Sequence, residues 1–148
     1  MGITIDHGAL LGAIGDAVVV CDAGGKIVLW NPAAQRMFGY TSAEALGQSL
    51  DLIIPERLRQ RHWEGYDKTM ATGITRYGHD LLRVPATDKS GRALSIAFTV
   101  AMLHEAGGKV NAIAAVIRDE TTRFAEERAL KKRVAELEAQ LAAPPARS

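Results

Sequence analysis

The chain has 148 residues, of which 47% are hydrophobic and 24% charged, so it can form one globular domain with a short appendage, and wholesale disorder is excluded. Its formal net charge of +1 gives no electrostatic reason to expect nucleic acid or an anionic membrane as a partner. No apolar run approaches the roughly 20 residues that span a bilayer, and the N-terminus lacks the pattern of a secretory signal, so we expect a cytoplasmic protein.

A helical lead-in and a hairpin are predicted first. Residues 4–15 form the lead-in, and the apolar runs 17–21 and 26–30 then flank the segment DAGG, which favours a hairpin turn. Cys21 lies inside the first strand and is interpreted as a small buried hydrophobic residue. Because it is the only cysteine, an intrachain disulfide and a cysteine-based zinc site are excluded.

Two short helices should follow the hairpin. Asn31 is suited to cap a helix whose first residue is Pro32, and Gly39 is placed to end that helix. Thr41 and Glu44 have the T-x-x-E spacing of a capping box, which predicts the start of the second short helix.

A longer amphipathic helix is predicted between Pro55, which suits the first helical turn, and Gly73, which is placed to end it. At 3.6 residues per turn, one face of this helix should point into the domain and the opposite face toward water. The inward face carries Leu58, His62, Gly65, Tyr66 and Thr69, and the outward face carries Arg57, Arg61, Glu64 and Lys68.

Two residues of the inward face have both a structural and a functional interpretation. His62 is either a hydrogen-bonded core histidine or a metal ligand. A glycine inside a helix costs roughly 1 kcal/mol relative to alanine, so Gly65 indicates close approach by either a flat ligand or a neighbouring backbone. This helix alone does not decide between a cofactor and a packed core.

After Gly73 the apolar residues alternate with period two, which predicts three strands. The strands are expected at 76–84, where Pro85 limits the far end, at 95–102 and at 110–117, with turns in DKSG and EAGGK. Two strands, a group of helices and three further strands predict the α+β class, with an antiparallel sheet and the helices on one side.

A final helix is predicted after a cap in residues 119–122. Its apolar residues recur at spacings of four, three and four, which is a seam of two coiled-coil heptads. They are Leu130, Val134, Leu137 and Leu141. Because so narrow a stripe cannot bury itself, a partner helix is favoured over packing against the domain. Residues 144–148 are expected to be disordered.

No active site is visible in the sequence. The chain contains no phosphate-binding glycine loop, no G-x-S-x-G elbow and no H-E-x-x-H pair. Its remaining histidines and its aspartates are scattered, without the spacing of metal ligands or paired catalytic carboxylates. We therefore do not expect an enzyme.

Several segments together resemble a PAS domain. They are NPAAQRMFGY and TSAEALG in the short helices and RDETT before the last helix, and the resemblance covers about residues 8–123. It implies a sensory and dimerisation module with a five-stranded antiparallel sheet whose inner face and helices hold a pocket. The expected divisions are 1–15 for the lead-in, 16–120 for the PAS domain, 121–143 for the coiled-coil helix and 144–148 for the tail.

The long helix resembles that of haem-binding PAS domains in rhizobial oxygen sensors, where an R-x-R-H segment carries the proximal histidine. Residues 59–62 read RQRH, so the resemblance implies that His62 is the iron ligand of a b-type haem. The other residues that it implies around the haem are Lys68 and Arg76 at the propionates and Phe98 and Val100 at the apolar distal wall. Leu58, Gly65 and Tyr66, which share the inward face with His62, are also expected to bind the cofactor.

The chain departs from that family at one important position. The oxygen sensors carry an arginine on the strand after the helix, and this arginine moves onto bound oxygen. The corresponding residue here is Leu82, while Arg83 follows on the opposite side of the strand, so a one-residue slip or a bulge is needed to bring Arg83 to the haem. No NCRFLQ-like helix with a reactive cysteine occurs, so no flavin–cysteinyl adduct is expected.

Two functions of different classes follow. The first is a haem-based sensor of oxygen or another diatomic gas, which signals through a homodimer and the C-terminal helix to another protein in trans. The second is a cofactor-free dimerisation and interaction module, or a small-metabolite sensor, in which His62 is a core residue.

Overall fold

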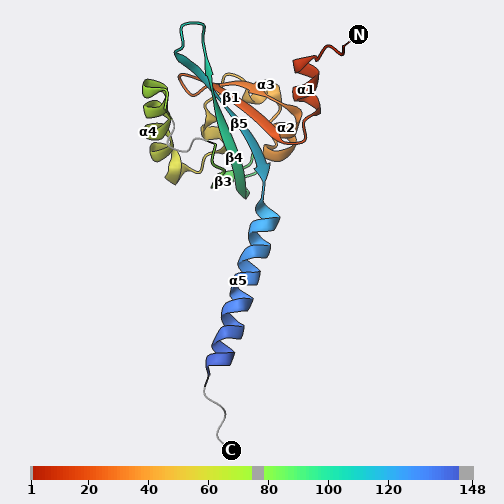
Figure 1. The fold of residues 1–148 in the computed structure, drawn as a ribbon, viewed down its shortest axis with the longest axis vertical. Coiled ribbons are helices and arrows are strands. Elements are labelled where there is room, and N and C mark those ends of the chain that lie inside the picture. Colours follow the sequence, from red (N-terminus) through yellow and green to blue (C-terminus); the bar gives the residue numbers. More distant parts are fainter. Residues whose placement is uncertain (1, 75–78, 144–148) are drawn as a thin grey trace, which may run out of the picture.

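The chain folds into an antiparallel sheet with helices beside it and a long helix that leaves one end of the sheet (Figure 1). The elements, in chain order, are α1 (His7–Ala13), β1 (Ala17–Asp22), β2 (Ile27–Trp30), α2 (Pro32–Phe38), α3 (Ser42–Ala45), the 3-10 helix η1 (Leu50–Ile53), α4 (Glu56–Thr72), β3 (Leu82–Thr87), β4 (Ala93–His104), β5 (Val110–Asp119) and α5 (Thr121–Ala142). This computed structural model describes residues 2–74 and 79–143. The predicted α+β class and five-stranded antiparallel sheet are confirmed.

The sheet joins the two ends of the domain. Its strand order is β2-β1-β5-β4-β3, so the N-terminal hairpin meets the C-terminal strands where β1 pairs with β5, from Ala17 opposite Ile117 to Asp22 opposite Ala112. The first and last strands of the domain are therefore neighbours, and a displacement of the hairpin reaches β5 and the helix that follows it directly.

The predicted N-terminal elements form where local sequence signals are strong. α1 is shorter than the predicted lead-in of residues 4–15. Its N-cap is Asp6, whose carboxylate accepts a hydrogen bond from the backbone N–H of Ala9, so the helix begins only at His7. In the β1–β2 turn, the Asp22 carboxylate accepts two backbone hydrogen bonds. Gly25 has φ of 81° in this turn, a conformation that glycine adopts without strain.

The short helices also begin and end as predicted. Gly39 ends α2 in the left-handed conformation. Thr41 and Glu44 form the reciprocal capping box at the start of α3. The predicted stop signal of α2 and start signal of α3 are thus confirmed. The two helices bury Ala33, Ala34, Phe38 and Ala45.

Asn31 does more than cap α2. Its side-chain oxygen accepts hydrogen bonds from the backbone N–H of Ala34 at 3.0 Å and of Val18 at 2.9 Å. Its side-chain amide donates to the carbonyls of Leu11 and Asp16, both at 3.1 Å. Because Asn31 is buried and these bonds satisfy its polar atoms, it fixes α1, β1 and α2 relative to one another.

The predicted position of the third strand is wrong. β3 begins at Leu82 and continues through Pro85 to Thr87, whereas residues 76–78 of the predicted strand 76–84 lie outside the described part of the chain. Pro85 is opposite Ser95 and does not end the strand. The reason is that β3 is an edge strand, where proline is tolerated because no further strand needs its missing N–H.

The start of α5 is fixed to β4. The backbone N–H of Glu120 donates to the carbonyl of Ser95 at 2.8 Å, and the backbone N–H of Ser95 donates to the hydroxyl oxygen of Thr121 at 3.0 Å. The Asp119 carboxylate accepts from the backbone N–H of Thr121 at 2.9 Å, within the predicted cap. Beyond this junction α5 projects away from the sheet (Figure 1), and it contains no buried residue. Among the described residues, no helix is long and apolar enough to cross a membrane.

Candidate functional site

α4 is attached to the turn of the β1–β2 hairpin through Trp63. The Trp63 ring lies so close to Gly25 that a Cβ atom placed there would be 2.3 Å from a ring carbon. The indole N–H of Trp63 donates to the Asp51 carboxylate at 2.7 Å. Gly25 is therefore required both for its backbone conformation and for the close approach of this ring.

Tyr66 attaches the next turn of α4 to the same hairpin. Its hydroxyl donates to the carbonyl oxygen of Asp22, and its ring belongs to the core. Burial raises the pKa of the Tyr66 hydroxyl above its ordinary value, with a smaller contribution from the neighbouring acidic groups, so the hydroxyl stays protonated and remains a donor. Burial likewise raises the pKa of the Cys21 thiol to about 12, which makes this cysteine an inert core residue, as predicted.

His62 lies beside these two aromatic residues. Its ring meets Trp63 edge-on with a centroid separation of 4.6 Å and lies 5.9 Å from the ring of Tyr66. The Nδ1 atom is buried and has no hydrogen-bond partner among the described residues. Burial lowers the pKa of His62, and the negative charge of Asp51 opposes this effect only in part. The site therefore favours a neutral imidazole with an unused ring nitrogen, which is the form that binds a metal.

The other predicted site residues of α4 lie in different environments, and only some agree with the prediction. Leu58 is half-buried and packs against the core, as expected for the inward face. The expectation for Gly65 is wrong, because this residue is exposed and a Cβ atom there would meet nothing within 4 Å. Lys68 is exposed on α4, and Arg76 lies outside the described residues.

The two residues predicted for the distal wall share the inner face of the sheet. Phe98 packs against the core cluster, and Val100 lies two residues further along β4, opposite Ala115. Both are only half-buried, although Leu94 and Ile96 on the same face of β4 are 3% and 5% exposed. The inner face is thus incompletely covered along this part of β4.

Leu82 and Arg83 separate onto opposite faces of the sheet. Leu82 is opposite Phe98 and half-buried, whereas Arg83 is opposite Ala97 and exposed. The pairing of β3 with β4 continues without a shift from this point to Thr87. Neither a slip nor a bulge brings the arginine inward, so the condition under which Arg83 would contact a haem on the inner face is not met.

Sequence reasoning missed Trp63, although its side chain helps to attach α4 to the hairpin. The indole follows His62 directly, and a helical pattern does not reveal that residue 63 contacts a turn far away in sequence. The one sequence feature that indicates this contact is in the turn. The segment DAGG contains Gly25, and the absence of a side chain there allows the Trp63 ring to approach the backbone.

These residues fit a haem better than a free metal ion. No group of three or more histidine, cysteine, aspartate or glutamate side chains in the described ranges could hold an ion. A haem iron needs only one axial ligand from this chain, because the porphyrin supplies the others. His62 offers one such ligand atom, because its Nδ1 is buried without a partner among the described residues.

Both the fold and the comparisons identify a sensory type of domain. The model of the family described as PAS fold matches residues 8–119. The chain therefore belongs to the PAS family, which confirms the resemblance.

Relatives and solved structures agree with this assignment. An uncharacterised protein of Azorhizobium caulinodans is 34% identical over 84% of the chain and 17% of its own length. The sensor protein FixL of Bradyrhizobium diazoefficiens is 43% identical over 36% of the chain and 11% of its length. The oxygen sensor protein DosP of Escherichia coli is 27% identical over 74% of the chain and 13% of its length. A PAS domain from Colwellia psychrerythraea, 18% identical, has a TM-score of 0.69 over 78% of the chain and 95% of that structure.

The chain is similar to only part of these curated relatives, since the matched segments span less than a fifth of their lengths. What the comparisons give directly is a PAS sensory domain.

Proposed function

We propose that this PAS domain binds one b-type haem through His62 and senses oxygen or another diatomic gas. The observation that carries the proposal is the buried Nδ1 atom of His62, which has no partner among the described residues. A buried polar atom without a partner is uncommon and costs about 1–3 kcal/mol, so a metal bond is a reason for its presence. One relative, DosP of Escherichia coli, is an oxygen sensor protein, which supports the same class of signal.

The residues around His62 have separate tasks in this proposal. Trp63 and Tyr66 hold the helix on the hairpin, which fixes where the imidazole points. Burial keeps that imidazole neutral. Phe98 and Val100 supply an apolar surface that excludes water and favours small neutral ligands. Lys68 and Arg76 are proposed as the basic partners of the propionates.

When bound, the haem would supply an iron atom with an open position for a gas. The chain's own route for a signal starts at α4 and passes through Trp63 and Tyr66 to the β1–β2 hairpin. It continues from β1 to β5 across the pairing of Cys21 with Ile113, and from β5 to α5 at Asp119. We propose that a homodimer, formed in part by α5, passes this signal to another protein in trans.

The test is a spectrum of the purified full chain after haem is added. We expect a Soret band that is lost or strongly altered in His62→Ala and unchanged in the matched control His104→Ala, which removes an exposed histidine at the end of β4. Binding with an identical spectrum in His62→Ala would remove this residue from the proposed role.

A second candidate function is favoured by the contacts of the same histidine. His62 already packs against two aromatic rings, and Arg83 does not reach the inner face. In a cofactor-free interaction module, or a sensor of a small metabolite, these contacts would make His62 a core residue. Expression with ample haem precursor separates the two, because a colourless protein with no Soret band supports the second candidate.

A further inference from the structure

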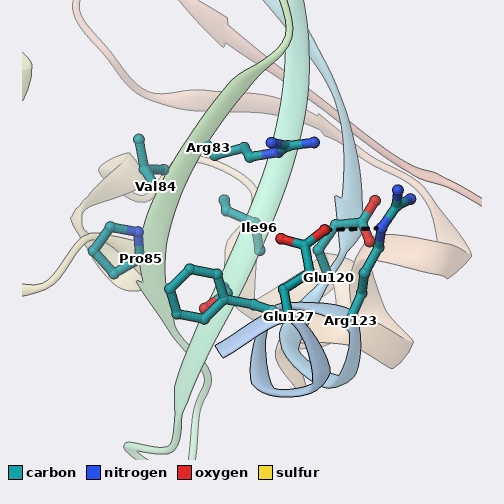
Figure 2. Close-up of a pocket in the computed structure, with 9 residues that line it drawn as sticks. Arg83, Val84, Pro85, Ile96, Glu120, Arg123 and Glu127 are labelled. Carbon is teal, nitrogen blue, oxygen red and sulfur yellow. Dashed lines mark ion pairs between the residues drawn. The ribbon is translucent and has the colours of Figure 1, made fainter. Parts of the chain in front are cut away.

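A hollow of about 270 Å³ lies where α5 leaves the sheet, between strands β3 and β4 and the first turns of the helix (Figure 2). Apolar side chains of both the sheet and the helix contribute to it, and charged side chains surround them. The apolar residues are Val84, Pro85, Ile96 and Phe124, and the charged residues are Arg83, Glu120, Arg123 and Glu127. The ring of Phe124 is 45% exposed, so a hydrophobic surface remains open there.

The walls of this hollow are held in place by backbone bonds. Ser95 lies in the wall and both accepts from Glu120 and donates to Thr121. The first turn of α5 is therefore fixed against β4, and the hollow is a defined feature of the junction.

The hollow lies on the face of α5 that carries the exposed apolar seam. Glu120, Arg123 and Glu127 precede Leu130 at spacings of three, four and three, and the same alternation continues along the seam to Leu141. The seam residues are between 42% and 87% exposed. A helix that covered the seam would consequently run along the same face to the hollow.

Charge identifies a second copy of the chain as the occupant. In a parallel pair of helices, equivalent seam positions face each other, so Glu127 would meet Glu127 of the other copy. Arg123 already pairs with Glu127 of its own helix at 3.5 Å. Arg83 has no ion-pair partner among the described residues and lies on the same side of β3 as the charged residues of α5 (Figure 2). It supplies the additional positive charge that such an acidic layer requires.

We propose that this hollow receives the first turns of α5 from a second copy of the chain, and that Arg83 of each copy pairs with Glu127 of the other. This inference rests on the dimer in the proposed function and is independent of the haem. It also gives the junction a role in signalling, because a shift of β4 relative to β3 would change where the second helix sits.

Sedimentation equilibrium of the full chain tests the proposal. We expect Arg83→Glu to weaken the dimer about tenfold, because each copy then places one more acidic side chain against the two Glu127 side chains. The double variant Arg83→Glu/Glu127→Arg should recover most of that affinity, since the charges are exchanged. The matched control Arg57→Glu makes the same change at an exposed residue of α4 and should leave the dimer unchanged.

Leu137→Asp on the seam serves as a positive control that dissociates the dimer. If Leu137→Asp dissociates it while Arg83→Glu behaves like Arg57→Glu, the hollow is not part of the interface and the proposal is overturned. A wild-type chain that is monomeric at tens of micromolar overturns both the proposal and the dimer. Circular dichroism verifies that each variant is folded, and the Soret band tests the haem function separately.

Discussion

The inner face of the sheet is filled very differently on its two sides. On the β1–β2 side, Val19, Cys21, Ile27 and Trp30 are between 1% and 5% exposed. On the β4–β5 side, Leu94, Ile96 and Ile117 are equally buried, but further along these strands the apolar residues of the same face are only half-buried. They are Phe98, Val100, Ile113 and Ala115. The β1–β2 side is a closely packed core, whereas the β4–β5 side has apolar surface that the protein itself does not fully cover.

The difference arises from the helices that cover each side. α2 places Phe38, which is fully buried, into the core, and the ring of Trp30 lies 5.6 Å from it. α4, in contrast, places a single buried side chain, that of Tyr66, in the core. Its other contacts include Trp63 against the hairpin and Gly73 near Val110 at the start of β5. A helix that buries so little covers less of the apolar face beside it than α2 does.

The largest effect should come from the matched pair Ile27→Ala and Ile113→Ala, which flank Cys21 on the two sides of the face. Ile27 is 1% exposed, so its truncation leaves a cavity and should lower the free energy of unfolding by about 2–5 kcal/mol. Ile113 is half-buried, and its truncation should cost about 1 kcal/mol, because fewer contacts are lost. Urea unfolding monitored by circular dichroism measures both.

Equal losses at these two positions would show that the β4–β5 side is packed as tightly as the other. Haem sharpens the comparison, because we expect it to raise the midpoint of the wild type more than that of Ile113→Ala. Ile27→Ala should retain the full haem-induced increase in the midpoint, since this residue lies on the closely packed β1–β2 side.

The next effect concerns the attachment of α4. Gly25→Ala introduces a Cβ atom 2.3 Å from Trp63 at a φ of 81°, so it should displace the ring and lower stability by about 2–3 kcal/mol. Gly47→Ala is the matched control, because its φ is 83° and nothing lies within 4 Å. It should show only the backbone strain, about 1 kcal/mol.

Urea unfolding gives the stabilities of these two variants, and tryptophan fluorescence reports the environment of the Trp63 ring. Similar losses and similar spectra in both variants would mean that the contact of Trp63 with the hairpin does not hold α4.

The sequence predicted the closely packed β1–β2 side of the domain well, because the signals that define its helices are local. Asn31, Thr41 and Glu44 cap helices through bonds to residues three positions away, and such bonds can be read from spacing alone. Gly39 and Gly73 end helices for an equally local reason, since both adopt a positive φ.

The candidate site was predicted less completely, because it depends on contacts between distant segments. The inward position of Tyr66 follows from helical periodicity, but its bond to Asp22 does not. Gly65 was placed inward by the same periodicity and is exposed, since α4 contacts the rest of the domain along a narrower face than expected. The side of the sheet on which Arg83 lies depended on strand register, which no single strand reveals.

A smaller effect is expected from Trp63→Phe. This change keeps an aromatic ring over Gly25 but removes the 2.7 Å hydrogen bond to Asp51, so stability should fall by about 1 kcal/mol. If the bond positions His62, the Soret maximum of the haem-loaded chain should also move. Trp30→Phe removes a comparable indole bond, to the carbonyl of Tyr40 at 2.9 Å, and should leave the Soret maximum unchanged. A shift of equal size in both variants would indicate a general loosening of the fold and no positioning role for Trp63.

The smallest effect is a pH dependence of stability that comes from His62. Its pKa in the folded chain is lowered, mainly by burial, whereas in the unfolded chain it returns to the ordinary value of about 6.5. The folded chain then binds fewer protons, so the contribution of this group is complete above about pH 6.5 and is lost as the pH falls toward the folded pKa. The midpoint of urea unfolding, measured from about pH 7.5 to pH 5, should therefore decline less steeply in His62→Gln than in the wild type. His104→Gln, at an exposed position, should follow the wild type. Parallel curves for wild type and His62→Gln would mean that the imidazole is hydrated in solution, and α4 would then cover the β4–β5 side even less than the structure shows.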